Sequence, residues 1–164
     1  MAGQYAKDTE VSTDRSLAEI RTTLRRYDPD YEFAFGEKKG VAIIEFTLRG
    51  RQVRFMLALP QPDEPRFTKT PTRRDRSPAA AREEHEKAVR RIYRVFVLVV
   101  KAKLEAVESG LTEFQTEFMA QLVLPGGMTV GDAVNDRITE AYETGQVPSL
   151  LPDYGRRALP SGVR

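Results

Sequence analysis

Three adjacent segments of two-residue alternation constrain the fold of this chain most strongly. Aromatic residues alternate with small or charged ones over residues 31–35, and apolar residues occupy every other position over 41–49 and 52–59. Short turns at 37–40 and at Gly50 separate the three segments. Alternation of this period, interrupted by short turns, is typical of antiparallel hairpins. The sequence therefore predicts an antiparallel meander of three or four strands.

Helical spacing precedes this meander. Leu17, Ile20 and Leu24 recur on one face of an expected helix, and a cap is expected at residues 12–14. The helix should end at Asp28-Pro29, because the residue before a proline avoids the helical conformation.

A second, longer helix is expected after the meander, from Ser77-Pro78 to Ser109. The residues between 95 and 100 are apolar on all sides and mostly β-branched, so a strand is the alternative there. We favour a helix because an apolar stripe continues on both sides of that run. An all-round apolar segment predicts that the middle of this helix is deeply buried or contacts a second subunit. The stripe consists of Val89, Ile92, Tyr93, Phe96, Val100, Leu104 and Val107.

Two shorter helices are expected towards the C-terminal end. One begins at Thr112, with Gln115 completing a capping box, and the other runs from Thr129 to Gly145. The predicted fold class is therefore α+β: the meander packs against the long helix, with small C-terminal helices beside them.

The 164 residues suffice for one domain, and a hydrophobic content of 40% suffices for a core. We expect a flexible N-terminus over residues 1–11, a single domain over 12–145 and a C-terminal tail over 146–164.

The charges of the chain are strongly segregated. Residues 51–103 carry fourteen Lys and Arg against six Asp and Glu, a net charge of +8. Residues 104–143 carry eight acids and one base, a net charge of −7. Residues 60–78 combine five prolines with several of the bases, which predicts a long, exposed, basic loop. Such segregation indicates two faces with different partners, one of them a polyanion.

The leading functional hypothesis is a non-enzymatic nucleic-acid-binding protein that prefers single-stranded DNA. Single strands are bound by cationic grooves combined with aromatic stacking platforms. Tyr31, Phe33 and Phe35 would stack on bases if their face of the sheet were open, and Arg90, Arg91 and Arg94 would add charge. The alternative is that the strand aromatics belong to the core and the arginines are solubilising charge. The predicted interface consists of Arg49, Arg51, Arg54, Arg66, Phe67, Lys69, Arg73, Arg74 and Arg76.

No motif predicts an enzyme, a cofactor or a metal. There is no cysteine, and the Gly126-Gly127 pair lacks the lysine of a phosphate-binding loop. His85 lies among glutamates and is expected to be a surface residue. The acids at 132, 136 and 140 share a helix face and are expected to be solvated, with a metal-dependent nuclease as the remote alternative. The longest apolar run is too short to span a bilayer, and the first residues have no apolar leader, so a cytoplasmic location is expected.

The acidic C-terminal helices support a second hypothesis. They would dock another protein, which makes the chain a protein-binding module. An exposed edge of an antiparallel sheet also favours a homo-oligomer.

Several short motifs occur in a fixed order, at residues 14–20, 53–55, 59–60, 100–110, 117–118 and 124–125. This order resembles a group of small proteins, of uncharacterised function, that bacteriophages and prophages encode. It implies a bacterial host cell, and it implies that the docked protein of the second hypothesis is a phage or host protein. The chain would then be a replication accessory factor or an inhibitor of a host defence enzyme. The resemblance implies work in phage replication, recombination or counter-defence, and it implies no catalytic residues. The helix–three-strand–helix order also resembles the whirly-type single-strand DNA-binding proteins, which use sheet surfaces and oligomerise.

Overall fold

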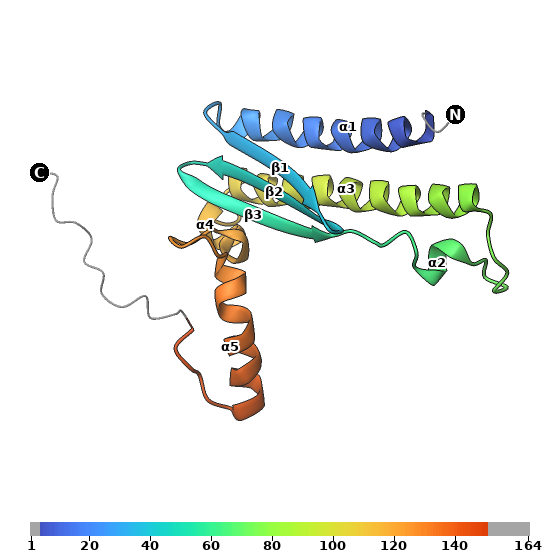
Figure 1. Ribbon diagram of the computed structural model, residues 1–164. Coiled ribbons are helices and arrows are strands. Elements are labelled where there is room, and N and C mark those ends of the chain that lie inside the picture. The colour runs from blue at the N-terminus through green and yellow to red at the C-terminus, as the bar shows by residue number, and fades with distance from the viewer. Residues whose placement is uncertain (1–3, 151–164) are drawn as a thin grey trace, which may run out of the picture.

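The computed structural model describes residues 4–150, with side chains from Thr13 onward, and it confirms the α+β fold (Figure 1). A three-stranded sheet packs on two long helices, and smaller helices follow. The elements in chain order are α1 (Gln4–Tyr27), β1 (Glu32–Lys38), β2 (Val41–Leu48), β3 (Arg51–Ala58), α2 (Pro65–Thr68), α3 (Pro78–Glu108), α4 (Phe114–Glu117), the 3-10 turn η1 (Met119–Gln121) and α5 (Val130–Thr144).

The sheet is the predicted antiparallel meander, in the order β1-β2-β3. Phe46 of β2 pairs with Phe33 of β1 and with Val53 of β3, so these three residues share one face. Alternate residues of β2 are fully buried on that face, and their neighbours in the strand are half-buried on the other. The alternation in the sequence therefore decides which face of the sheet joins the core.

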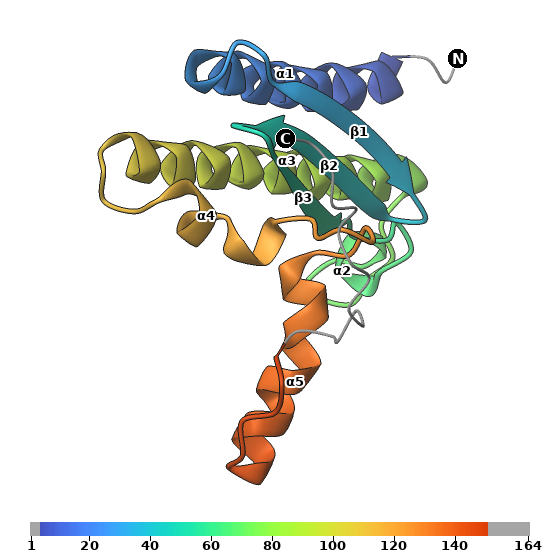
Figure 2. The same cartoon turned by 90° about the vertical axis from the view of Figure 1, so that its left-hand side faces the viewer.

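Helices α1 and α3 lie side by side against this face and run in the same direction (Figures 1 and 2). Leu17, Ile20 and Leu24 of α1 are buried at the junction. Beside them, Glu19 accepts a hydrogen bond from the Lys101 ammonium of α3, and this bond lowers the pKa of the Glu19 carboxyl.

Helix α3 is the longest element, and the structure confirms it as a helix through residues 95–100. Ser77 caps it by accepting from the Ala80 N–H at 3.3 Å. Tyr93 is fully buried at its centre, and its hydroxyl donates to Glu37 of β1 at 3.4 Å. Burial of this ring, with the Glu37 carboxylate beside it, raises the pKa of the Tyr93 phenol.

Two expectations about helix starts are wrong. Helix α1 begins at Gln4, not at residues 12–14, because no glycine or proline interrupts residues 4–27 and the packed half of the helix propagates into them. Much of the stretch expected to be flexible, residues 1–11, is therefore helical. Helix α4 begins at Phe114 after Glu113, without a side-chain cap, so the expected capping box at Thr112 does not form.

Helix α5 is attached to the rest of the fold by its first turn. The predicted cap is confirmed: Thr129 Oγ1 accepts from the Asp132 N–H at 3.1 Å, and the Asp132 carboxylate accepts from the Thr129 N–H. Gly131 lies so close to the Ala120 carbonyl of η1 that a Cβ would approach the oxygen to 2.9 Å. The remaining turns project away from the sheet and α3 (Figures 1 and 2).

Substitution of Phe118 tests this core. Its ring is fully buried and lies 6.1 Å from Phe46 and 4.8 Å from Phe114. We expect Phe118→Ala to lower the free energy of unfolding by about 3–5 kcal/mol in urea titrations, because it removes a ring that the core cannot refill. The neighbouring Met119→Ala should stay within about 0.5 kcal/mol of the parent protein, since Met119 is exposed. Equal effects of the two substitutions would contradict this core.

Candidate functional site

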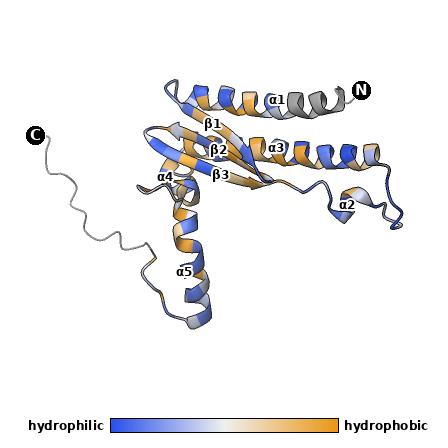
Figure 3. Ribbon diagram, viewed as in Figure 1, coloured by the Kyte–Doolittle hydropathy of each residue, from blue (hydrophilic) through white to orange (hydrophobic). Residues whose placement is uncertain are grey.

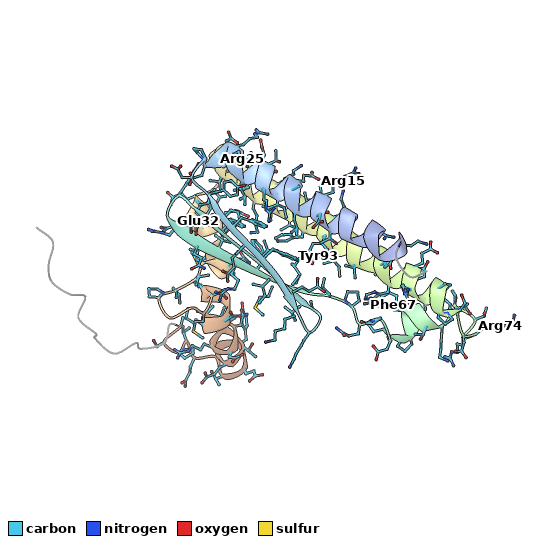
Figure 4. All side chains as sticks on the ribbon, turned by 45° about the horizontal axis from the view of Figure 1, so that its top comes forward. Arg15, Arg25, Glu32, Phe67, Arg74 and Tyr93 are labelled. Carbon is cyan, nitrogen blue, oxygen red and sulfur yellow. The ribbon has the colours of Figure 1, made fainter. Side chains whose placement is uncertain are left out.

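Eight of the nine residues predicted to bind nucleic acid lie at two opposite ends of the molecule, and the ninth, Arg54, lies in the middle of β3. Arg49 and Arg51 flank the β2–β3 turn, beside the end of α1, where the Arg49 N–H donates to Asp28 at 2.8 Å. Residues 60–77 follow the other end of β3, where the Leu59 N–H donates to the Gly40 carbonyl of the β1–β2 turn. Figure 4 shows this separation: Arg25 labels the first end and Arg74 the second. The structure therefore does not gather the predicted interface into one continuous surface.

The arginines of β3 and of the β2–β3 turn hold the fold together. Arg54 is ion-paired with Glu45 across the sheet, and its guanidinium also donates to the Gly127 carbonyl. The guanidinium of Arg51 donates to the side-chain oxygen of Gln115 in α4 at 3.0 and 3.1 Å. The backbone hydrogen bond from Arg49 lowers the pKa of Asp28. Arg51 and Arg54 therefore join β3 to the C-terminal segments, whereas the contact of Arg49 is made by its backbone N–H with the turn after α1.

Phe67 is not the exposed stacking ring that the sequence predicts. It lies on α2 and is 4% exposed, with its ring edge-on to His85 of α3 at 5.3 Å. The guanidinium of Arg66 covers the ring at 4.7 Å, and His85 Nε2 lies 2.9 Å from the Pro60 carbonyl. Phe67 and His85 therefore fasten the loop to α3. The loop has little other apolar material, so its one ring is buried.

Internal hydrogen bonds hold the rest of the loop in one shape. The Thr70 N–H donates to the Arg74 carbonyl at 2.8 Å, and Lys69 is ion-paired with Asp75 at 3.0 Å. The Arg76 guanidinium donates to the carbonyls of residues 66 and 67 and so closes the last turn of α2. Residues 69–76 therefore form a compact turn with Arg73 and Arg74 at its tip.

Arg73 and Arg74 are exposed, and their side chains make no ion pair or hydrogen bond with another residue in the described range 4–150. The same holds within that range for Lys38 and Lys39 of the β1–β2 turn and for Arg82 of α3. We call these five residues the unpaired cations; sequence reasoning did not select Lys38, Lys39 or Arg82. The hairpin pattern could have indicated Lys38 and Lys39, since the β1–β2 turn and the exit of β3 share one end of the sheet; no such pattern indicates Arg82.

Most acids of the loop and of the first turns of α3 are ion-paired with bases other than the unpaired cations. Glu64 pairs with Arg66, Asp75 with Lys69, Glu83 and Glu84 with Lys87, and Glu86 with Arg90. Among the acids of the loop and the first turns of α3, Asp63 alone has no ion pair within the described residues. A positive potential therefore remains at the tip of residues 69–76 and around it. Figure 3 shows this end as predominantly hydrophilic, in contrast to the middle of α3.

The sheet carries no aromatic platform. Tyr31, Phe33 and Phe35 lie on the face that packs against the helices, where Phe35 meets Tyr93 edge-on at 6.3 Å. The register places Gly36, Ile43 and Met56 in one row of the opposite, open face. None of the residues that β1, β2 and β3 present on that face is aromatic. Tyr31 and Phe33 are partly buried against the core, as the alternative reading has it, whereas Phe35 is 39% exposed at the border of the same face.

The predicted acidic cluster on α5 forms no metal site. Asp132 caps the helix with Thr129, and no group of three potential ligands close enough for a metal ion occurs in the described residues. Within the same part of the chain, none of the helices combines the length and apolar content that a membrane span requires.

No protein-family model, curated protein or solved structure matches this chain. Its function has to be inferred from its own residues and their geometry.

Loss of the Phe67 ring should release the loop without unfolding the protein. We expect Phe67→Ala to raise the rate of trypsin cleavage at Arg73 and Arg74 by about tenfold or more, because the cavity it leaves favours local opening of the loop. Phe67→Leu, which keeps most of the apolar contact, is the matched control. Unchanged cleavage in the alanine variant, at an unchanged melting temperature, would show that the ring does not fasten the loop.

Proposed function

We propose that this protein is a non-enzymatic nucleic-acid-binding protein whose basic end contacts the phosphate backbone. One observation carries the proposal: five cations from three elements have no ion pair within the described residues. They lie on the part of the molecule, here called the basic end, that extends from the β1–β2 turn, beside the middle of α3, to the loop tip beyond the N-terminus of α3 (Figure 1). Most of the neighbouring acids are paired with other bases, and Glu37 accepts from the Tyr93 hydroxyl. Five phosphate contacts would make the logarithm of the affinity fall with a slope of about −4 against the logarithm of salt concentration.

The loop presents its arginines in a prepared geometry. The Thr70 N–H donates to the Arg74 carbonyl, and Thr70 accepts from the N–H groups of Arg73 and Arg74; with the Lys69–Asp75 pair these bonds hold the backbone at the tip. A loop that is already ordered loses less conformational entropy on binding, so more of the Coulomb attraction remains as affinity. The planar guanidinium also matches a phosphate with two parallel hydrogen bonds, which a lysine does not offer.

Recognition through phosphates sets the expected specificity. Because Phe67 of α2 is buried and the rings of β1 lie on the face of the sheet that packs against the helices, we do not propose base stacking, and sequence preference should be weak. The sequence predicts a preference for single strands. The titration described below compares single with double strands and so measures that preference. The resemblance to phage-encoded proteins supports a role in replication or recombination in a bacterial host cell.

A salt titration of binding to a labelled oligonucleotide tests the proposal. Fluorescence anisotropy with single and double strands should show an affinity that falls steeply from low to physiological salt. The double variant Arg73→Ala/Arg74→Ala should weaken binding and lower the magnitude of the slope by about 1.5, because two phosphate contacts are lost.

The matched control is Arg15→Ala/Arg25→Ala, which removes the same charge from exposed positions on α1. This control should leave the slope within experimental error. Absence of binding at low salt, or an equal loss in both double variants, would overturn the proposal.

Helix α5 favours a second candidate function, the docking of a protein. Its apolar side exposes 41% of Ile138 and 88% of Tyr142. Its opposite side carries the acids Asp132, Asp136, Glu140 and Glu143. An amphipathic helix with one acidic side fits an apolar groove that is rimmed by basic residues.

A stoichiometric complex that survives nuclease treatment would support this second function if it depends on α5. We expect Ile138→Glu to abolish such a complex, because the carboxylate would enter the apolar groove. Thr139→Glu adds the same charge to a neighbouring exposed position and should leave the complex intact. Loss of the complex in both variants, or in neither, would contradict docking through this face.

A further inference from the structure

The outer face of α3 is apolar although nothing among the described residues covers it. Val95, Leu98 and Val99 are 50%, 56% and 40% exposed, and Ala102 one turn later is exposed as well. The inner face of the same helix already supplies the core, with Val89, Tyr93, Phe96, Val100 and Leu104. Exposed Leu and Val at adjacent positions of a helix are typical of a surface that another chain covers.

The outer face has the spacing of a helix–helix seam. Arg91, Val95, Leu98, Ala102 and Glu105 follow one another at alternating steps of four and three residues, the repeat of facing positions in a coiled coil. All five are exposed. The apolar part of the seam is therefore closed by a base at one end and by an acid at the other.

We propose that two copies of this chain associate through the outer faces of α3, antiparallel, with Leu98 at the two-fold axis. In this register Leu98 packs against Leu98 of the second copy, and Val95 packs beside Ala102 of the second copy. Arg91 then lies opposite Glu105 of the second copy, and the two-fold axis forms this pair twice.

The charges of Arg91 and Glu105 favour a second copy of this chain as the partner, and they favour the antiparallel orientation of the two helices. In a parallel pair each Arg91 would face another Arg91 and each Glu105 another Glu105, and such like-charge contacts destabilise an interface. The antiparallel pair converts both contacts into ion pairs. A surface whose two ends carry opposite charge at equal distances from Leu98 is complementary to itself, so the favoured occupant is a second copy of this chain.

The neighbouring charges are compatible with this arrangement. Arg94, on the same flank of the helix, lies 3.9 Å from Glu19 of its own chain, and Glu105 lies 3.5 Å from the Tyr27 hydroxyl. These contacts position both groups at the border of the seam and do not cover it. The inference is independent of nucleic-acid binding, because it concerns the protein alone.

The mass of the protein in solution, without nucleic acid, tests the association. Light scattering at tens of micromolar should give twice the mass of the chain, and Leu98→Glu should give the mass of a single chain. Leu111→Glu is the control, since Leu111 is 82% exposed and lies beyond the end of α3. A monomeric parent protein, or a dimer that survives Leu98→Glu, would overturn the proposal.

Charge reversal and cross-linking test the direction. Arg91→Glu should weaken the dimer, and Arg91→Glu/Glu105→Arg should restore it, because the pair is re-formed with reversed signs. The chain has no cysteine, so single cysteines can be placed at will. Leu98→Cys should form a disulfide with itself, and a mixture of Arg91→Cys and Glu105→Cys should form the mixed disulfide. Cross-linking of Arg91→Cys with itself, or failure of the double reversal to restore the dimer, would exclude the antiparallel register.

Discussion

Packing of the inner stripe of α3 against the buried face of β2 is the interaction on which the rest of the structure depends. Every other described part of the chain is attached to this pair. Helix α1 lies along α3 through its own apolar residues, α2 is fastened by Phe67 on His85, and α4 is held where Lys103 pairs with Glu117 at 3.0 Å. Because one face of α3 already satisfies the core, the apolar residues on its opposite face are available for association.

The elements that follow a regular period are the ones that could be predicted from the sequence. The strands, their buried faces and α3 follow from spacing alone, because burial on one side imposes the period of two or of 3.6 residues. The start of α1 could not be predicted in this way. Its first residues are mostly polar, so they carry no apolar stripe, although the helix extends through them. Phe67 was misassigned because its partner, His85, lies in another element, and the sequence gives no sign of that contact.

The charge pattern of the sequence predicts the basic region but not the pairing of its individual bases. A net charge of +8 over residues 51–103 correctly indicates a basic region, but it does not tell which bases stay unpaired. Arg54 is ion-paired with Glu45, and Arg76 donates to a backbone carbonyl of α2. Lys38 and Lys39 lie outside residues 51–103 and add to the positive charge of the basic end. In an antiparallel dimer with Leu98 at the two-fold axis, the N-terminal ends of the two α3 helices would lie roughly 60 Å apart, because about 20 residues at 1.5 Å each separate Leu98 from either end. The loops with Arg73 and Arg74 lie at these ends. Two phosphate-binding ends on one particle would then engage one long nucleic acid together.

Hydrogen exchange of the protein with and without a nucleic acid tests the central claim most directly, because it locates the contact. The account predicts slower exchange at residues 69–76 and at the β1–β2 turn, with little change on the open face of the sheet and on α5. Protection spread over the open sheet face, with the loop unchanged, would contradict it.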